Sequence, residues 1–436
     1  MIRRTVLPLV LSLTLGPAIP AQAQAPLTLA DAISRAQTQH PTAQAAEAAA
    51  HTAAHRLREA RAGQLPIADM TEAWQRGNQP VYAFGSLLGQ RQFLAEHLAL
   101  DALNHPPATN NLRLGVTVEQ PLFNKGTGAA IQAARLGTEL AGIARAAVAS
   151  DLRAAVTEAY ARVMATGAAH RAADRAVEAA AADHARAGDR RDAGRVTDAD
   201  VLQFDVHVAR VRRQQIGAQA GERIARAQLN ELMGEPLDAV FDLTPVTTGT
   251  TEAAPPAVDV LTIRPDVRTA AVQESLAATA VSAARAAFLP QVSAQAGWEA
   301  NGGTWASRSR SWAVGVVGRV NLFRGFADQA RLKAAESDAT RRAAERRQVE
   351  AAARLDVLAA RARLDAAAAG EEVGRAAVAQ AQEGQRIVRD RYEQGLADSV
   401  ALLRAAEMAY EADAAQAAAS AEVLVARAAL DRAMGR

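Results

Sequence analysis

The spacing of apolar positions alternates along the chain between a period of two and a helical period. Residues 112–119, LRLGVTVE, alternate apolar with polar or small side chains, and residues 292–299 and 312–321 do the same. This alternation predicts strands with one apolar face and one polar face. Residues 67–74 follow the pattern more weakly because Glu72 falls on the apolar face, and we expect a local bulge there. The four strands form two predicted hairpins.

Long alanine-rich stretches of helical periodicity flank and separate these hairpins. At about 1.5 Å per residue, a helix over 126–192 would be roughly 100 Å long. Glycines at the far end of the long stretches, Gly194 and Gly395, predict turns between antiparallel helices. The predicted segments are a signal peptide at 1–23, helical segments at 24–65 and 263–289, β-hairpins at 66–121 and 290–322, helical hairpins at 122–233 (turn near 188–200) and 323–436 (turn near 389–399), and a linker at 234–262.

The lengths of the helical stretches predict how the chain runs back from each distant turn toward the strands; we call these segments the return paths. The outgoing helix at 126–192 is nearly as long as the pieces at 196–233 and 263–288 taken together. We therefore expect these two pieces to stack end to end, with the linker bulging out at their junction. By the same argument, residues 400–433 and 29–62 form the other return path. Both chain ends then meet at the level of these junctions, which we call the waist.

The two halves of the chain contain the same short sequence motifs in the same order. The shared motifs are Gln120-Pro121-Leu122-Phe123 and Val320-Asn321-Leu322-Phe323, Gly194 and Gly395, Met233-Gly234 and Met434-Gly435, and Trp74 and Trp298, each eight residues after a proline. The glycine pair and the Met-Gly pair are both separated by 201 residues, and the phenylalanine pair by 200. Chance similarity between alanine-rich helices would not keep these motifs in register, so we expect two structural repeats.

The first residues predict export. Arg3 and Arg4 precede an apolar run at 5–15 that is too short to span a bilayer, and Ala21-Gln22-Ala23 is the expected cleavage site, with Ala23-Gln24-Ala25 as a second choice. A buried N-terminal helix is the alternative, but it would not need these features in this order. The chain has no cysteine, which excludes disulfides, thiolate chemistry, cysteine metal sites and a lipid-modified cysteine after the signal.

Charge and composition narrow the class of protein. Of the 49 basic residues two lie in the signal peptide, which leaves 47 against 47 acidic ones, whereas nucleic-acid binders carry a basic surplus. Aromatic residues make up 4%, too few for an ordinary large core but compatible with closely packed helices. No later stretch is apolar over the length of a membrane-spanning helix, so only strands in a closed barrel could cross a membrane.

The strands carry tryptophan at one end. At about 3.3 Å per residue, Trp74 and Trp298 lie roughly 26 Å above the prolines, the height of an outer-membrane apolar band, and Trp312 begins its strand at that end. We expect these three side chains at a membrane interface. A soluble sandwich is the alternative, but long helices interrupt the strands. The aromatic-rich segment 77–111 is an expected extracellular loop or lid.

Four strands leave two open edges, which a hydrocarbon environment does not tolerate. The barrel must therefore be shared among copies of the chain. Two, three or four copies all satisfy this requirement.

The sequence resembles the TolC family of outer-membrane efflux proteins in motifs that span the mature chain. The matching motifs are Leu27-Thr28-Leu29-Ala30-Asp31-Ala32 with His40-Pro41, Gln120-Pro121-Leu122-Phe123, Ile263-Arg264-Pro265-Asp266-Val267-Arg268, Phe288-Leu289-Pro290-Gln291-Val292 and Tyr392-Glu393-Gln394-Gly395. The resemblance implies an α+β membrane protein, a homotrimer with a shared 12-stranded β-barrel in outer-membrane lipid and a periplasmic α-barrel tunnel. It also implies a periplasmic adaptor (a membrane fusion protein) and an inner-membrane transporter such as a resistance-nodulation-division pump as partners, in tripartite efflux or type I secretion.

The resemblance further implies a gate at the periplasmic end of the tunnel. Asp200 lies six residues after the turn glycine, where the family places a gate carboxylate, and Tyr392 matches the family's tyrosine. Ala397 and Ala401 replace the arginine and the aspartate expected in the second repeat. Arg391 is a candidate substitute for the missing arginine.

Two further expectations concern this end of the molecule. Asp200 could instead cap the helix that begins near Thr197, a role that would not involve gating. The turns at Gly194 and Gly395 are the expected docking sites of the adaptor.

No arrangement of residues predicts catalysis, a cofactor or a metal site. His51 and His55 are spaced to bind a metal from one helix face but lack the carboxylate of a zinc-binding helix, so we expect them to face solvent. The competing classes are a soluble periplasmic coiled-coil scaffold or tethering protein and a periplasmic metal-binding protein. The first explains the helices and the signal peptide but not the two tryptophan-bearing hairpins, and the second rests on scattered histidines.

Overall fold

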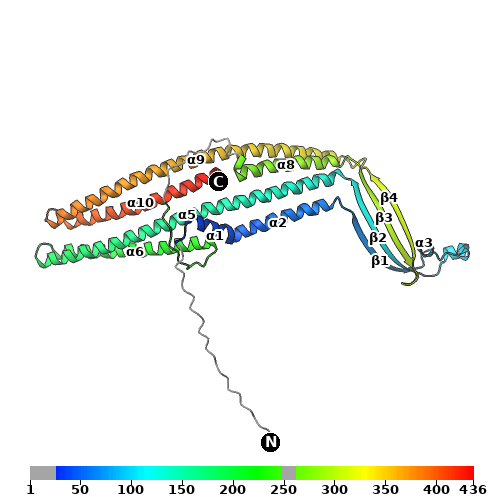
Figure 1. The fold of residues 1–436 in the computed structure, drawn as a ribbon, viewed down its shortest axis with the longest axis horizontal. Helices are drawn as coiled ribbons and strands as arrows, with labels where there is room; N and C mark the ends of the chain where they lie inside the picture. The colour runs from blue at the N-terminus through cyan, green and yellow to red at the C-terminus, as the bar shows by residue number, and fades with distance from the viewer. Residues whose placement is uncertain (1–25, 247–261) are drawn as a thin grey trace, which may run out of the picture.

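The computed structural model describes residues 26–246 and 262–436. The predicted signal peptide at 1–23 and residues 247–261 of the predicted linker lie outside the described residues. The described part is elongated, with long helices side by side over most of its length and a sheet at one end (Figure 1). The prediction of a mostly helical protein with a four-stranded antiparallel sheet is confirmed.

Alanine-rich sequence accounts for the two long helical hairpins, and three of their four helices begin with a side-chain cap. The first consists of α5 (Lys125–Asp192) and α6 (Asp198–Met233), and the second of α9 (Ala327–Glu393) and α10 (Ser399–Ala433). α5 has 68 residues, which corresponds to about 100 Å at 1.5 Å per residue. Three shorter helices, α1 (Leu29–Gln39), α2 (Pro41–Ala62) and α8 (Pro265–Ala286), complete the helical part between the waist and the sheet.

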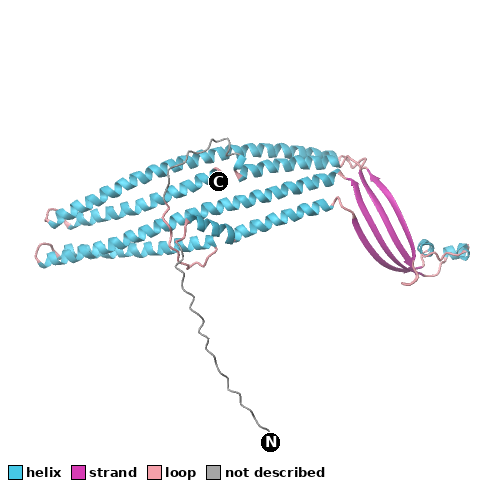
Figure 2. Ribbon diagram, viewed as in Figure 1, coloured by secondary structure: helices cyan, strands magenta, loops and turns pink. Residues whose placement is uncertain are grey.

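The sheet consists of β1 (Ile67–Gly77), β2 (Thr109–Phe123), β3 (Gln291–Gly302) and β4 (Ser309–Arg319), in sequence order and antiparallel throughout (Figure 2). Residues opposite each other in a register share a face. Trp298 lies opposite Trp312 and Val116, whereas Arg113 and Asn301 lie on the other face. The sheet therefore has the apolar face and the polar face that the alternation predicts.

The expected bulge at Glu72 is wrong. The register between β1 and β2 runs without a shift from Ile67 to Gly77, with Glu72 opposite Leu114. Glu72 is instead accommodated by an ion pair, because the Nη2 atom of Arg308 lies 2.7 Å from its Oε1 atom. The irregularity in this sheet lies between Pro121 and Phe123 of β2, where proline has no N–H to donate to the neighbouring strand.

The expected stacking of the return helices is also wrong. α6 ends beside α1 and continues the row of α1 and α2, whereas α10 ends beside α8 (Figure 1). An ion pair of 2.9 Å joins Arg35 to Glu235 at the first junction. At the second junction, the buried Arg264 donates to the carbonyl oxygen of Ala433 at 3.1 Å and pairs with Asp266. The helix lengths are compatible with either arrangement, and side-chain packing at the waist decides between them.

A compact core at the waist fixes this arrangement. Buried residues of α1, α5 and α6 form it: Ala32, Ala36, Val156, Tyr160, Ala225, Leu229 and Met233, with Leu27 preceding α1. The alanines of α1 allow the backbones to approach closely, and the hydroxyl of Tyr160 donates to the carbonyl oxygens of Leu27 and Thr244 at 2.9 and 2.7 Å. Both ends of the described chain lie at this waist, as expected, since the Ser150 hydroxyl donates to the Arg436 carbonyl.

Candidate functional site

Two helical turns lie at the end of the molecule farthest from the sheet (Figure 1). Each contains a glycine in the left-handed region, Gly194 at φ 69° and Gly395 at φ 76°. In both turns the N–H of the next residue donates back to the last helical turn, Arg195 to Arg190 and Leu396 to Arg391, each at 2.8 Å. These are Schellman turns, and the two copies have the same hydrogen bonds. A Cβ atom added at either glycine would meet no atom within 4 Å, so both turns face open space.

Asp200 closes the cap of α6. Its Oδ2 atom accepts from the backbone N–H and the hydroxyl of Thr197 at 2.9 and 2.8 Å, while the Thr197 hydroxyl accepts from the Asp200 N–H. In the second turn Asp398 caps α10 by accepting from the N–H of Ala401, which has no carboxylate to return the bond. The capping role weighed for Asp200 is therefore present in the structure.

Asp200 also reaches across to the second helical hairpin. The buried hydroxyl of Ser399, the first residue of α10, donates to its Oδ1 atom at 2.9 Å and lies 3.2 Å from Gln203. The hydrogen bonds from the Thr197 backbone, the Thr197 hydroxyl and Ser399 together lower the pKa of Asp200 below its usual range. One carboxylate thus holds the start of α6 and links the two turns.

Tyr392 is buried between the two turns, where it packs against Phe204, Ala187 and Leu402. Its ring lies 6.2 Å from that of Phe204, and the guanidinium of Arg190 lies 4.6 Å above it. Arg190 also donates to the Tyr392 carbonyl oxygen at 2.7 Å. Burial raises the pKa of the Tyr392 hydroxyl, which keeps it neutral.

Of the three predicted gate residues, the structure brings Asp200 and Tyr392 into the region between the turns. Arg391 is exposed, whereas the adjacent Tyr392 is buried. Arg190 holds the position that we expected for Arg391, and Ser399 holds the Asp200 carboxylate; sequence reasoning missed both. The repeat offset of 201 residues relates Arg190 to Arg391 and could have identified Arg190.

A seam of charged residues joins the two helical hairpins behind the turns. Arg210 of α6 pairs with Glu407 of α10 at 2.9 Å, and the buried Asp183 of α5 lies 3.6 Å from Arg389 of α9. His207 is buried beside them, and its Nδ1 atom lies 3.2 Å from Nη2 of Arg210. Asp183, His207, Arg210 and Glu407 also line a cavity of about 40 Å³. Since Arg210 can only donate, this contact requires a neutral His207.

We expect acidification to loosen this seam. Burial, followed by the charge of Arg210, lowers the pKa of His207, although Glu407 and Asp183 oppose the shift. Protons therefore bind more readily to an open seam than to a closed one. The closed seam is fully stable above the ordinary histidine pKa of about 6.5 and loses stability as the pH falls below it. The thermal midpoint should therefore fall between about pH 7.5 and pH 5 in the parent, and fall less in His207→Gln. An identical fall in His207→Gln would contradict this assignment.

The predicted interface tryptophans all lie on the apolar face of the sheet. Trp298 and Trp312 are direct cross-strand partners. Trp74 lies opposite Leu112, and Leu112 lies opposite Gly302. Trp74 is therefore level with Gly302, four residues beyond Trp298 toward the C-terminal end of β3. Trp74 and Trp312 are 69% and 74% exposed in the single chain. The apolar face is thus left uncovered by the chain itself.

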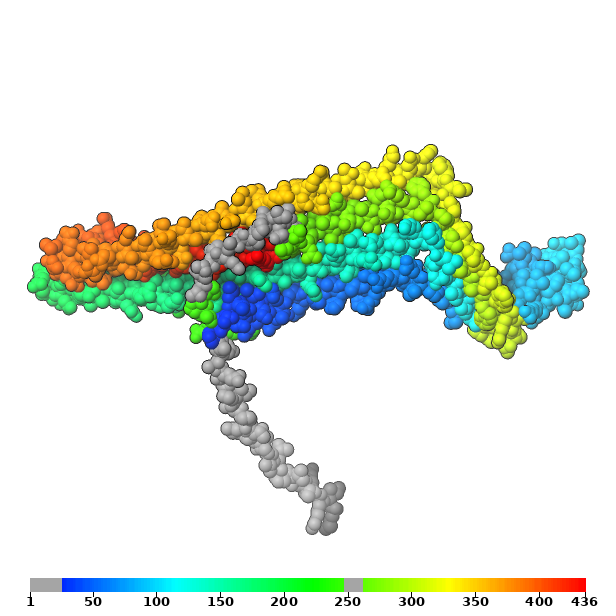
Figure 3. Space-filling model, turned by 45° about the horizontal axis from the view of Figure 1, so that its top comes forward, coloured from blue at the N-terminus to red at the C-terminus, as the bar shows by residue number. Residues whose placement is uncertain are grey.

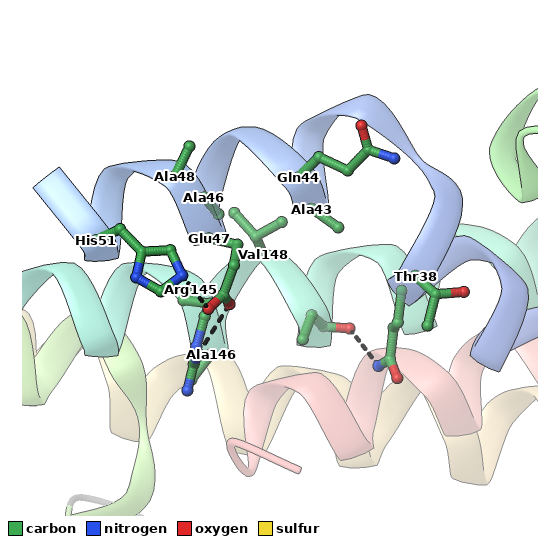
Figure 4. A pocket seen from close by; sticks show the side chains of 12 residues that line it. Thr38, Ala43, Gln44, Ala46, Glu47, Ala48, His51, Arg145, Ala146 and Val148 are labelled. Atoms are coloured by element: carbon green, nitrogen blue, oxygen red, sulfur yellow. Dashed lines mark hydrogen bonds and ion pairs between the residues drawn. The ribbon is translucent and has the colours of Figure 1, made fainter.

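A groove at the waist lies between α2 and α5 (Figure 4). Its volume is about 700 Å³, and much of its lining is alanine. Glu47 lies 2.9 Å from Arg145 and 3.4 Å from His51, while Gln37 donates to the carbonyl oxygen of Ala149. His51 therefore lies beside a carboxylate of its own helix, and the same carboxylate pairs with Arg145.

Two features are absent from the described residues. Within 26–246 and 262–436, no helix combines the length and the apolar character that crossing a membrane requires. The same residues contain no group of three histidine, aspartate or glutamate side chains placed to hold a metal ion.

Solved structures with the same architecture are outer-membrane and membrane proteins. A membrane protein from Pseudomonas aeruginosa is 21% identical, with a TM-score of 0.80 and 93% of each chain covered. The outer membrane protein VceC from Vibrio cholerae is 20% identical (TM-score 0.78, 93% of this chain and 96% of that one). The MtrE outer membrane channel of Neisseria gonorrhoeae, in its open state, is 19% identical (TM-score 0.76, 93% and 88%). These likenesses establish the fold.

No curated protein matches the sequence significantly. The family model described as outer membrane efflux protein matches residues 32–235 and 258–436, which is most of the chain. Both helical hairpins, the sheet and the two turns fall within these ranges. The chain therefore belongs to the outer membrane efflux protein family and is a subunit of an outer-membrane efflux channel.

Proposed function

We propose that three copies of this chain form one conduit, with a shared 12-stranded β-barrel in the outer membrane and a tunnel of helices in the periplasm. The observation that carries the proposal is the four-stranded sheet, in which β1 and β4 each pair on one side only. Its apolar face bears Trp74 and Trp312, which suits contact with lipid. Closing the barrel with further copies supplies the missing hydrogen bonds at both edges. A soluble scaffold would leave this face without a function.

The outer rows of helices support the same assembly. α9 packs on α10 and α8, and α6 packs on α5 and α1, so these two helices form opposite borders of the chain. Each carries exposed aliphatic residues along one face: Leu202, Val206, Ile216 and Ile224 on α6, and Leu355, Leu358, Val373 and Ile387 on α9. Their spacing follows the helical repeat. Contact between α6 of one copy and α9 of the next would bury both stripes and close a ring.

The partners at the periplasmic end are a periplasmic adaptor protein and, through it, an inner-membrane transporter such as a resistance-nodulation-division pump. The two Schellman turns at Gly194 and Gly395 face open space and have the same geometry, which suits binding of repeated adaptor subunits. Asp200, Tyr392 and Ser399, with Arg190, hold the two turns together and would keep the tunnel closed at rest. Arg391, which is exposed, would face a neighbouring copy or the adaptor.

The number of chains in the assembly can be tested by measuring its mass. The 436 residues have a mass of 45.7 kDa, and native mass spectrometry in detergent should give a species of three chains, each lighter than this by the predicted signal peptide. Leu358→Asp should release monomers, because it places a charge in the stripe of α9 that the next copy covers. Leu358→Met keeps the surface apolar and should remain trimeric. A stable monomer of the parent protein in detergent would contradict the shared barrel.

A further inference from the structure

The long loop between β1 and β2 contains three short helices. They are α3 (Pro80–Gly89), the 3-10 helix η1 (Ala95–Leu98) and α4 (Leu100–Asn104). We call residues 78–108 the mouth segment. It lies beyond the ends of the strands, at the opposite end of the molecule from the helical turns (Figures 1 and 3).

The mouth segment is fastened to the polar face of the sheet. The buried side chain of Gln90 donates to the carbonyl oxygen of Asn110 at 2.7 Å and to the Oδ1 atom of Asn111 at 3.2 Å. Asn111 donates in turn to Asn301, and the Ser309 hydroxyl donates to the Gln90 carbonyl oxygen at 2.8 Å. Asn111, Asn301 and Ser309 alternate with the tryptophan side of their strands.

The mouth segment is held together internally but leaves apolar side chains uncovered. The rings of Phe84 and Phe93 pack edge to face with centroids 4.7 Å apart, and Ala83 and Ser86 of α3 are buried. The exposed aliphatic residues are Val81 (80%), Leu88 (49%), Leu94 (58%), Leu98 (61%) and Leu100 (76%). So many uncovered large aliphatic groups within one short segment indicate a contact surface.

We propose that the mouth segments of three copies pack against one another and close the outer end of the conduit. The inference rests on the proposed trimer, in which the tryptophan face meets lipid and the polar face lines the interior. A segment fastened to the polar face then lies toward the axis of the assembly, where two further copies present the same apolar side chains. Lipid is not the occupant, because it covers the opposite face of the sheet.

Cysteine cross-linking tests this contact, since the chain has no cysteine of its own. Ala99 lies between Leu98 and Leu100 and is exposed, so Ala99→Cys adds a thiol without disturbing a packed residue. Ala306 is an equally exposed alanine in the other loop at the same end and provides the matched control. Ala99→Cys should form disulfide-linked dimers within the assembled protein on mild oxidation, and Ala306→Cys should not.

A second measurement tests closure itself. The double variant Leu98→Ser and Leu100→Ser should conduct severalfold more current per channel in a planar bilayer than the parent. Trimers of Ala99→Cys that form no dimers, or quenching of a fluorophore on that thiol by spin-labelled lipid, would overturn the proposal while leaving the trimer intact. Unchanged conductance of the double variant would overturn closure. Absence of a trimer in native mass spectrometry of the parent would instead refute the proposed function.

Discussion

Replacing Gly194 and Gly395 together with tryptophan is expected to abolish export while the protein still assembles. Both glycines have a positive φ, which costs an L-residue about 1–2 kcal/mol per position. The larger effect comes from bulk. No atom lies within 4 Å of the Cβ position at either turn, so the added rings would project from the end of the molecule where the adaptor is proposed to dock.

Efflux of a fluorescent dye from cells that depend on this channel measures the effect, with native mass spectrometry as the test of assembly. Gly142→Trp is the matched control, because Gly142 lies within α5, away from the border helices α6 and α9, and its Cβ position also faces open space. Asparagine at both turns separates strain from bulk, since asparagine adopts the left-handed conformation readily. Asparagine variants should export better than the tryptophan ones. Dye efflux at the parental rate in the double tryptophan variant would rule out docking at the turns.

The sheet could be predicted from the sequence because its geometry is local. Side chains of a strand alternate between faces whatever surrounds them, so the pattern at 112–119 identified the apolar face directly. Glu72 was misjudged because its partner, Arg308, is 236 residues away in the sequence. A charge on an apolar face predicts either a distortion or a partner, and only the folded chain reveals which.

The waist could not be predicted because helix length carries no information about neighbours. α6 and α10 have nearly the same length, as do α2 and α8, so either pairing fits the same total. The choice depends on packing around Tyr160 and on the hydrogen bonds of Arg264, which are contacts between distant parts of the chain.

In the candidate site, the two turn glycines could be predicted because they occur at equivalent positions of the two repeats. Gly194 and Gly395 were found because a left-handed turn requires glycine at a fixed place after a helix. Ser399 has no such signature. Its role follows from its position beside Asp200 in space, which depends on how the two helical hairpins pack together.

Removing the hydroxyl of Ser399 is expected to open the periplasmic end and raise single-channel conductance. Ser399→Ala deletes the hydrogen bond to Asp200 across the two turns and leaves the cap of α6 intact. Thr197→Val does the reverse, because it deletes the capping hydroxyl and retains Ser399. Asp200→Ala removes both contacts. Loss of the cap should lower the free energy of unfolding by about 1 kcal/mol, which would appear as a lower thermal midpoint.

The three variants separate gating from capping in one experiment. If the bond between the turns holds the tunnel closed, Ser399→Ala and Asp200→Ala should both conduct more than the parent, whereas Thr197→Val should only melt earlier. The largest causes of the low pKa of Asp200 are its bonds to Thr197, which stay within α6, but the bond from Ser399 also lowers this pKa and exists only while the two turns are joined. Through that bond the carboxylate favours the joined state above its ordinary pKa of about 3.9 and loses this contribution as the pH falls further. Conductance of the parent should therefore approach that of Asp200→Ala at strongly acidic pH. If Ser399→Ala conducts like the parent at neutral pH, the Asp200 carboxylate serves as a helix cap, and the closed tunnel must be held by Tyr392 and the seam around His207.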